Sequence, residues 1–456
     1  MAAIIQKNNR FCVVYSYYDE AGKRRQKWET FKSMPEAKVR QREVEYKEMV
    51  GTFVVPKCIT LGELLSEYVD LYGKTKWALS TYEANTSIIR NYILPKIGNT
   101  KISSITTRFI ERYYQSLLKT EAVSNGARRS KSKYLTPHTV KEIHEILRCC
   151  FNQAVKWEIM AKNPAANAMV PKVEHARREI WTAETLFRAL DLCDDPRLAL
   201  ALNLSFCCSL RMGEMLGLTW DCIDITEENM KDGTASVYVN KELQRVNRKI
   251  LNALDSKDVI VKFPAVSSNT STILVLKAPK TSSSVRKVFM PEAVAHMLIE
   301  WKRAQDEKIE LLGEEYQNYN LVFAGSLGLP TEASTINDAL HRLIKNNDLP
   351  PIVFHSLRHS SITYKLKLNG GDIKAVQGDS GHSQVKMVTD VYSHILDDSR
   401  KHNAQLFQEA FYDAKKGPQE KRETQTSEGL SPEILNRMLE SPEIVALLGA
   451  LAKKMG

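Results

Sequence analysis

Three linker-like segments interrupt this chain of 456 residues, and they constrain its fold more than any other feature. Each combines proline with charged residues: GTFVVPKC at 51–58, KNPAANAMVPKVEHARRE at 162–179 and AKKGPQEKRETQTSEGLSP at 414–432. Such composition interrupts helices and strands and does not build a core. A chain of this length also exceeds what one hydrophobic core supports. We therefore predict separate domains at 1–55, 56–173 and 174–413, followed by a linker and helical tail at 414–456.

The first segment has the pattern of a small sheet followed by a helix. RFCVVYSYY and KRRQKWETF are strand-like and flank DEAG, which suits a hairpin turn, and SMPEAKVRQREVEYKEMV predicts the helix. In the second strand a period of two places Lys23, Arg25 and Lys27 on one face. A cationic row suits DNA phosphates, but an ordinary solvated strand face has the same pattern.

From 60 to 160 the pattern is helical throughout. TLGELLSEYVDLYG is amphipathic, Ser80 with Glu83 predicts a capping box, and Thr136-Pro137 predicts the start of another helix. Between them NGARRSKSKY predicts a basic loop. Its four cations are candidates for contacts with DNA phosphates: Arg128, Arg129, Lys131 and Lys133.

The third segment combines helices with a few strands. TASVYVNKELQRV, STILVLKAPK and SVRKVFMP are rich in β-branched residues and predict strands. The stretch at 247–270 is polar and fits neither pattern. In the tail the last 24 residues regain helical periodicity, which Pro442 divides into two short helices. Helices that short are marginal in water and need a partner surface.

Charge and cysteine content narrow the class of protein. The net charge is +10 and the isoelectric point is near 9.0, which favours a polyanionic partner. The eight cysteines include two adjacent pairs in apolar stretches and no CxxC, as expected of buried thiols. No apolar run is long enough to cross a bilayer, and the N-terminus lacks a signal-peptide core. We therefore expect a cytoplasmic protein with no membrane partner.

The stretch VFHSLRHSSITY, residues 353–364, allows two interpretations. His355 and His359 are four apart and could share a metal on one helix face. A zinc-protease helix, however, needs an acid between its histidines to activate water, and this stretch has Arg358 and no acid. Alternatively, the N–H groups of a helix beginning near His355 and the Arg358 guanidinium would bind an anion such as phosphate. The missing acid favours the anion.

Other parts of the sequence complete a pattern. CCSLRMGEMLGLTW places Arg211 at the start of a short helix, and KAPKTSSSVRKV places Lys280 at an expected hairpin tip. Downstream, GDSGHSQVKMVTDVYSHI brings His382 and, ten residues later, Tyr392. In this order of Arg, Lys, His-x-x-Arg, Gly-His and Tyr, the chain resembles the tyrosine recombinases of the phage integrase family.

The resemblance implies a multidomain α+β fold. Its parts are a small β-sheet with a helix that binds secondary "arm" sites on DNA, an all-helical core-binding domain, and a mainly helical catalytic domain with a small antiparallel sheet. Ser209 and Ser380 stand where the family usually has Gly and Leu, and neither change removes a catalytic group.

The resemblance also implies roles in phosphate binding and attack. Tyr392 is the nucleophile that forms a phosphotyrosyl bond with DNA. Arg211 and Arg358 hold the nonbridging phosphate oxygens. Glu214, three residues after Arg211, orients that arginine.

Proton transfer falls to the remaining residues. Lys280 protonates the leaving 5′ oxygen, with Lys277 and Lys287 as alternatives for this role. His355 assists proton transfer, and His382 hydrogen-bonds the phosphate. No cofactor and no metal is expected.

The function implied is that of a site-specific DNA recombinase, the integrase of a phage or other mobile element in a bacterial cytoplasm. It would act as a homotetramer on core and arm sites of double-stranded DNA, through a Holliday junction and with an accessory bending or directionality factor as a further partner. In this family segments after the tyrosine often pack on a neighbouring protomer, so we expect the tail to dock in trans; docking in cis or a disordered end are the alternatives. A type IB topoisomerase and a nonenzymatic DNA-binding regulator of the same fold are the alternative functions.

Overall fold

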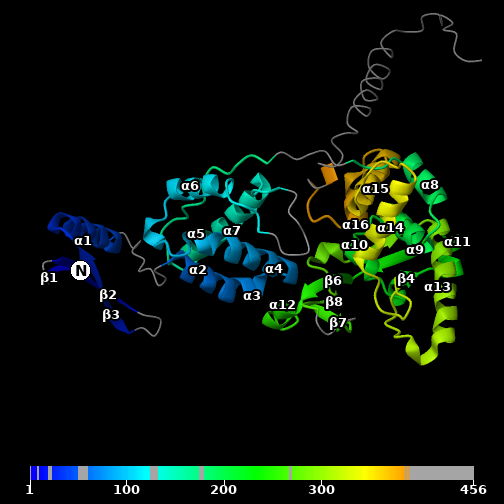
Figure 1. Cartoon of the computed structure of the whole chain (residues 1–456), viewed down its shortest axis with the longest axis horizontal. Helices are drawn as coiled ribbons and strands as arrows, with labels where there is room; N and C mark the ends of the chain where they lie inside the picture. Colours follow the sequence, from blue (N-terminus) through cyan, green and yellow to red (C-terminus); the bar gives the residue numbers. More distant parts are fainter. Residues whose placement is uncertain are drawn as a thin grey trace, which may run out of the picture. The chain divides into compact units, whose positions relative to one another are not determined.

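The computed structural model describes residues 2–7, 10–18, 23–49, 60–123, 132–173, 179–265, 270–385 and 388–389 (Figure 1). Tyr392, the whole tail and three of the four loop cations (Arg128, Arg129 and Lys131) lie outside the described residues. No described helix combines the length and the apolar character needed to cross a membrane.

An antiparallel sheet and one helix form the N-terminal domain. The strands lie in the order β1 (Ala3–Lys7), β2 (Arg10–Tyr18) and β3 (Arg24–Phe31), and the helix is α1 (Met34–Met49). Val13 and Tyr15 project from one face of β2 and pack on Ala37 and Val44 of α1. The predicted small sheet followed by a helix is confirmed.

The second domain is helical, as predicted, and has its own apolar core. Thr60 begins its first helix through a capping box with Glu63, and Thr136 caps the long helix that starts at Pro137. The capping box predicted at Ser80 is wrong, because Ser80 already lies inside α4. The elements are α2 (Leu61–Glu67), the π-helical η1 (Tyr68–Gly73), α3 (Lys74–Lys76), α4 (Leu79–Ile88), the π-helical η2 (Ile89–Ile93), α5 (Leu94–Ile97), the 3₁₀ turn η3 (Ile102–Ser104), α6 (Thr107–Leu117) and α7 (Pro137–Lys156).

The third predicted domain is built around α9, whose sequence PRLALALNLSFC is apolar on nearly every side. Such a helix must be surrounded, and α9 packs on α10, α13, α14 and α15 (Figure 1). The helices of this domain are α8 (Ala183–Asp191), α9 (Pro196–Cys207), α10 (Met212–Leu216), α11 (Glu227–Lys231), α12 (Arg248–Ala253), α13 (Glu292–Leu312), α14 (Ala333–Asn346), α15 (Phe354–Leu368) and α16 (Ile373–Ser380), with 3₁₀ turns η4 (Trp220–Cys222), η5 (Ser282–Ser284) and η6 (Gly313–Glu315).

Its strands form two antiparallel sheets of three strands. One has the order β4 (Ile223–Asp224), β5 (Ser236–Val239) and β9 (Arg286–Phe289); the other has the order β6 (Glu242–Asn247), β8 (Thr272–Lys277) and β7 (Val259–Lys262). The single strand expected over 234–246 is therefore two strands in two sheets. The break falls at Lys241, whose Nζ donates to Thr219 Oγ1 at 2.6 Å and pairs with Asp221 at 2.8 Å.

The stretch that fitted no pattern, 247–270, supplies α12 and β7. Leu251 and Leu254 of this stretch join Val246 and Val275 in the apolar cluster of the helical domain. The fold class, multidomain α+β with small sheets and mainly helical domains, is confirmed. The predicted domain boundaries stay predictions.

Candidate active site

Arg211 lies in the turn between α9 and α10, at the N-cap of α10. The Glu214 carboxylate reaches back to it and accepts hydrogen bonds from the Arg211 backbone N at 3.0 Å and Nη1 at 2.6 Å. This confirms the predicted position of Arg211 at a helix start, and it gives Glu214 the contact expected of a residue that orients Arg211. The turn depends on Ser209, whose φ is +53°. A residue in this left-handed conformation is usually glycine. Here it is serine, and its hydroxyl forms a hydrogen bond with the buried Ser361 hydroxyl at 2.6 Å.

Arg358 projects from α15 into the protein and is 1% exposed. Its Nη1 donates to the Ser209 carbonyl and its Nη2 to the Ser380 carbonyl. Its Nε has no hydrogen-bond partner among the described residues. Burial, and next the charge of Arg211, lower the pKa of Arg358. The two positions that depart from the family pattern, Ser209 and Ser380, are thus the two whose carbonyls hold this arginine.

His382 follows α16 after a left-handed Gly381, at φ +61°. Its Nε2 lies 3.3 Å from Arg358 Nη2, and its Nδ1 lies 2.8 Å from the Ser380 hydroxyl oxygen. Burial, and next Arg358, lower the pKa of His382 to about 3, so the ring is neutral at pH 7. Because arginine only donates, Nε2 accepts and the proton sits on Nδ1, which donates to Ser380.

His355 lies in the first turn of α15, as predicted, and is exposed. Its ring meets the His359 ring edge-on, with centroids 4.8 Å apart. Within the described part of the chain, no three His, Cys, Asp or Glu side chains are arranged to hold a metal. His355 is thus an exposed imidazole on the same helix as the buried Arg358 guanidinium, three residues later.

Lys280 lies in the connection 278–285 between β8 and β9. The expected hairpin tip is wrong, because β8 pairs with β6 and β7, whereas β9 pairs with β5 in the other sheet. Pro279 lacks the N–H that would continue the β8 ladder. The Lys280 side chain is exposed, and Nζ lies 3.5 Å from Thr81 Oγ1 of α4.

The two rival lysines are engaged elsewhere. Lys277 is 3% exposed and its Nζ lies 2.5 Å from Glu242 Oε1. Lys287 projects from β9 toward Asp224, at 3.9 Å, and over the Phe289 ring. These contacts favour Lys280 as the lysine able to reach a substrate.

Arg286 is a site residue that the sequence reasoning missed. It is 8% exposed on β9, and its Nη2 and Nη1 donate to the two Glu214 oxygens at 3.0 and 3.2 Å. Its Nε donates to the Asp379 carbonyl at 2.7 Å. The available signal was its register: Arg286 alternates with the exposed Lys287 and shares the buried face of β9 with Val288.

The predicted DNA-binding cations that the structure describes lie outside this cluster. Arg25 and Lys27 do share a face, since β2 and β3 pair Tyr15 with Lys27 and Tyr17 with Arg25, whereas Lys23 precedes β3. That face carries Tyr15 and α1, so it is not the open row that the pattern suggested. Lys133 is exposed and pairs with Glu121 at 3.4 Å.

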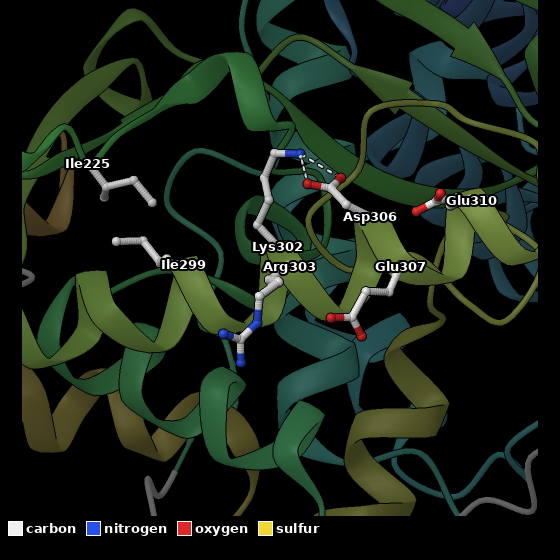
Figure 2. A pocket seen from close by; sticks show the side chains of 7 residues that line it. All are labelled: Ile225, Ile299, Lys302, Arg303, Asp306, Glu307 and Glu310. Atoms are coloured by element: carbon white, nitrogen blue, oxygen red, sulfur yellow. Dashed lines mark hydrogen bonds and ion pairs between the residues drawn. The ribbon is translucent and has the colours of Figure 1, made fainter.

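A hollow beside α13 is separate from this cluster (Figure 2). Its lining mixes cations with carboxylates: Ile225, Ile299, Lys302, Arg303, Asp306, Glu307 and Glu310. Lys302 reaches across one turn to Asp306 at 2.8 Å, as Figure 2 shows. None of the catalytic candidates that the structure describes lines it, so it is not counted as part of the site.

Two family models match the chain. The N-terminal SAM-like domain of phage integrases matches residues 60–118, and the phage integrase family matches residues 259–399. The first match falls on the helices α2 to α6 and their connections. The second contains Lys280, His355, Arg358, His382 and Tyr392.

Curated relatives match over most of their own length. The chain is 26% identical over 389 residues to a tyrosine recombinase XerC-like protein of Caldanaerobacter subterraneus subsp. tengcongensis, covering 83% of this chain and 90% of the relative. It is 25% identical over 326 residues to the ICEBs1 integrase of Bacillus subtilis, covering 71% and 76%.

The fold is similar to that of the Tn1549 transposon integrase, solved in complex with a circular intermediate DNA. The TM-score is 0.57 at 19% identity, covering 76% of this chain and 100% of that one. The matched domains, the names of the relatives and the order of the site residues all indicate a tyrosine recombinase. The chain is an enzyme of the tyrosine recombinase class, and its residues 60–118 and 259–399 match the models of the two phage integrase domains.

Proposed function

We propose that this recombinase integrates and excises a phage or other mobile element, through a 3′-phosphotyrosyl intermediate on Tyr392 and a Holliday junction. The observation that carries the proposal is the convergence of three phosphate-binding candidates on one turn. Arg211 Nη2 donates to the Gly381 carbonyl at 3.4 Å, and Arg358 Nη2 donates to the Ser380 carbonyl. The next residue of that turn is His382, 3.3 Å from Arg358.

The charge of this cluster suits an anion. The guanidinium groups of Arg211 and Arg286 contact the Glu214 carboxylate, and Arg358 lies buried nearby, so three positive charges face one negative charge. A phosphodiester gains negative charge as the nucleophile adds. Fixed donors in a partly buried site stabilise such charge without having to reorganise.

In the proposed reaction the Tyr392 oxygen attacks the scissile phosphorus, the P–O5′ bond breaks, and a P–O bond to tyrosine forms. His355 accepts the phenol proton, which an ordinary pKa of about 10 makes difficult to lose unaided. Lys280 gives a proton to the departing 5′ oxygen. Rejoining reverses these steps with a 5′ hydroxyl of the exchanged strand. One phosphodiester replaces another, so the reaction needs no ATP.

The proposed partners are double-stranded DNA and further copies of the chain. The net charge of +10 favours binding to a polyanion. A homotetramer on two duplexes, in the cytoplasm of a bacterial host and with an accessory bending or directionality factor, is the assembly we propose. Lys133, with Arg128, Arg129 and Lys131 by sequence, would contact phosphates of the core site.

We propose that the N-terminal domain binds arm sites through the sheet face that α1 leaves uncovered. Arg24, Gln26 and Trp28 alternate along β3 with Arg25 and Lys27, so they lie on this other face of the sheet. Trp28 is 48% exposed, and Arg24 Nη2 donates to Ser16 Oγ at 3.2 Å. A bare sheet face with a cation and an aromatic ring suits a DNA groove better than a row beside a helix.

Matched variants test this placement. Deleting residues 1–55 should spare cleavage of a core site and impair recombination between full attachment sites. Arg24→Gln should weaken arm-site binding, in a salt-dependent way, more than Arg25→Gln, which removes the same charge from the α1 face. A stronger effect of Arg25→Gln would return the arm contact to the row of Lys23, Arg25 and Lys27. Normal recombination by the deletion variant would remove the arm-site proposal.

Recombination itself is tested with two DNA molecules that carry the flanking sequences of the element. The purified protein should yield recombinant joints, which sequencing of the product ends identifies. Relaxation of supercoiled DNA without recombinant joints would instead identify a type IB topoisomerase. Binding without any strand cleavage would identify a nonenzymatic regulator.

A further inference from the structure

Two arginines share one buried carboxylate behind the proposed phosphate site. Glu214 is 1% exposed, and it accepts from Arg211 Nη1 at 2.6 Å and from Arg286 Nη2 at 3.0 Å. The two arginines differ in position, because the Arg211 side chain is 33% exposed and the Arg286 side chain is 6% exposed. Arg211 therefore faces outward, where a phosphate would arrive, and Arg286 lies behind it.

Arg286 is bound on every side. Its two terminal nitrogens take both Glu214 oxygens as a fork, its Nη1 also donates to the Ser284 carbonyl at 3.0 Å, and its Nε donates to the Asp379 carbonyl at 2.7 Å. A planar fork of this kind holds a carboxylate in one orientation, which a lysine cannot do. Gly381 completes the enclosure: a Cβ there would lie 3.0 Å from Arg286 Nη1.

The charges explain why a second arginine is needed. With Arg211 as its only partner, Glu214 would cancel the charge that Arg211 brings to a phosphate. With Arg286 as a second partner, two cations face one carboxylate, and a net positive charge remains. Burial alone would raise the pKa of Glu214, but Arg286, and after it Arg211, outweigh burial and lower the pKa. The carboxylate therefore stays ionised and continues to hold Arg211.

We propose that Arg286 is a positioning residue for Arg211: it fixes the Glu214 carboxylate and offsets its charge, so that Arg211 both stays oriented and keeps its charge for the scissile phosphate. This inference rests on the proposed role of Arg211 as a phosphate clamp. It assigns a function to a residue that lies buried behind Arg211 and contacts it only through Glu214 among the interactions described.

The test compares two substrates that differ in one charge. Cleavage is measured at saturating DNA, as the rate at which the covalent protein–DNA complex forms, on an ordinary site and on a site with an uncharged methylphosphonate at the scissile position. Arg286→Gln should slow cleavage of the ordinary site roughly tenfold or more. On the methylphosphonate the slowing should shrink to about threefold or less, because the transition state carries one negative charge fewer to be offset. Arg286→Lys, which keeps the charge without the fork, should fall between native and Gln.

Two controls keep the result interpretable. Arg245→Gln removes an arginine of β6 from an exposed ion pair with Glu332, the N-cap residue of α14, and should cleave both substrates at the native rate. Glu214→Gln added to Arg286→Gln removes the carboxylate whose charge is unbalanced, so the double variant should cleave the ordinary site faster than Arg286→Gln alone. Thermal unfolding confirms that each variant is folded at the assay temperature, and Arg286→Lys carries the comparison if Arg286→Gln is not.

The outcomes separate this inference from the proposed function. Equal slowing on both substrates, or a double variant no faster than Arg286→Gln, would overturn the inference and leave the proposed function intact. If the native protein formed no covalent complex on the ordinary site, the proposed function would fail and the inference with it.

Discussion

Replacing Lys280 with alanine should remove one chemical step and leave the fold unchanged. The side chain is exposed, and its one described contact is at the limit of a hydrogen bond, 3.5 Å to Thr81 Oγ1. The free energy of unfolding should therefore change by no more than about 0.5 kcal/mol. A positioned general acid contributes about 10²–10⁴ to a rate. Lys280→Ala should slow cleavage of an ordinary site by that factor.

A substrate with sulfur in place of the scissile 5′ oxygen isolates the cause. A thiolate leaves without a proton, so Lys280→Ala should cleave this substrate at nearly the native rate. The matched control is Lys277→Ala. Lys277 is buried and its Nζ lies 2.5 Å from Glu242 Oε1, so its loss should lower the free energy of unfolding by about 1–3 kcal/mol. Any loss of rate in Lys277→Ala should be the same on both substrates.

The assay is single-turnover cleavage of a nicked site, in which the covalent complex accumulates and is separated on a denaturing gel. Rates are compared at saturating DNA, so that weaker binding does not enter. If Lys280→Ala were equally slow on oxygen and sulfur, Lys280 would not be the acid. If sulfur rescued Lys277→Ala instead, the lysine assignment would be wrong.

The remaining predictions concern pH, a backbone turn and metals. The pKa of His382 is about 3 in the folded chain, below the ordinary 6.5, so the unfolded chain binds the proton more readily. The stability that this difference gives above pH 6.5 is therefore lost as the pH falls toward 3, by on the order of 2 kcal/mol between pH 7 and pH 5. A ¹H NMR titration of the His382 ring checks the pKa. Ser209→Ala should be less stable to heat than Ser209→Gly by about 1 kcal/mol, because both variants lose the Ser361 bond and only alanine keeps the left-handed strain. Cleavage should persist in a chelator, and a strict Mg²⁺ requirement would argue against the mechanism.

Local signals in the sequence were enough to predict the helices that carry Arg211 and the His355–Arg358 pair. Both depend on helix starts, which short-range patterns define. The strand pairing was not predictable in the same way. STILVLKAPK and SVRKVFMP look like the two arms of a hairpin, yet β8 and β9 pair with different partners. Pairing is set by tertiary packing that strand propensity does not encode.

Contacts over long sequence distances account for the other gaps. Arg286 and Glu214 are 72 residues apart, and Arg358 and Ser209 are 149 apart. No local pattern relates such residues. Ser209 and Ser380 could be noted only as departures from a family pattern, and their role in holding Arg358 through backbone carbonyls appears only in the fold. Similarly, the period of two placed Arg25 and Lys27 on one face of the sheet, but could not say which face α1 covers.

The most direct test of the central claim compares how much covalent protein–DNA complex the native chain and the Tyr392→Phe variant form. Phenylalanine keeps the ring and lacks only the oxygen that would attack the phosphorus. The variant should bind site DNA nearly as well as the native chain and should form no covalent complex on a nicked site that traps the native protein. A covalent complex of normal yield with Tyr392→Phe would contradict the assignment of Tyr392 and the mechanism built on it.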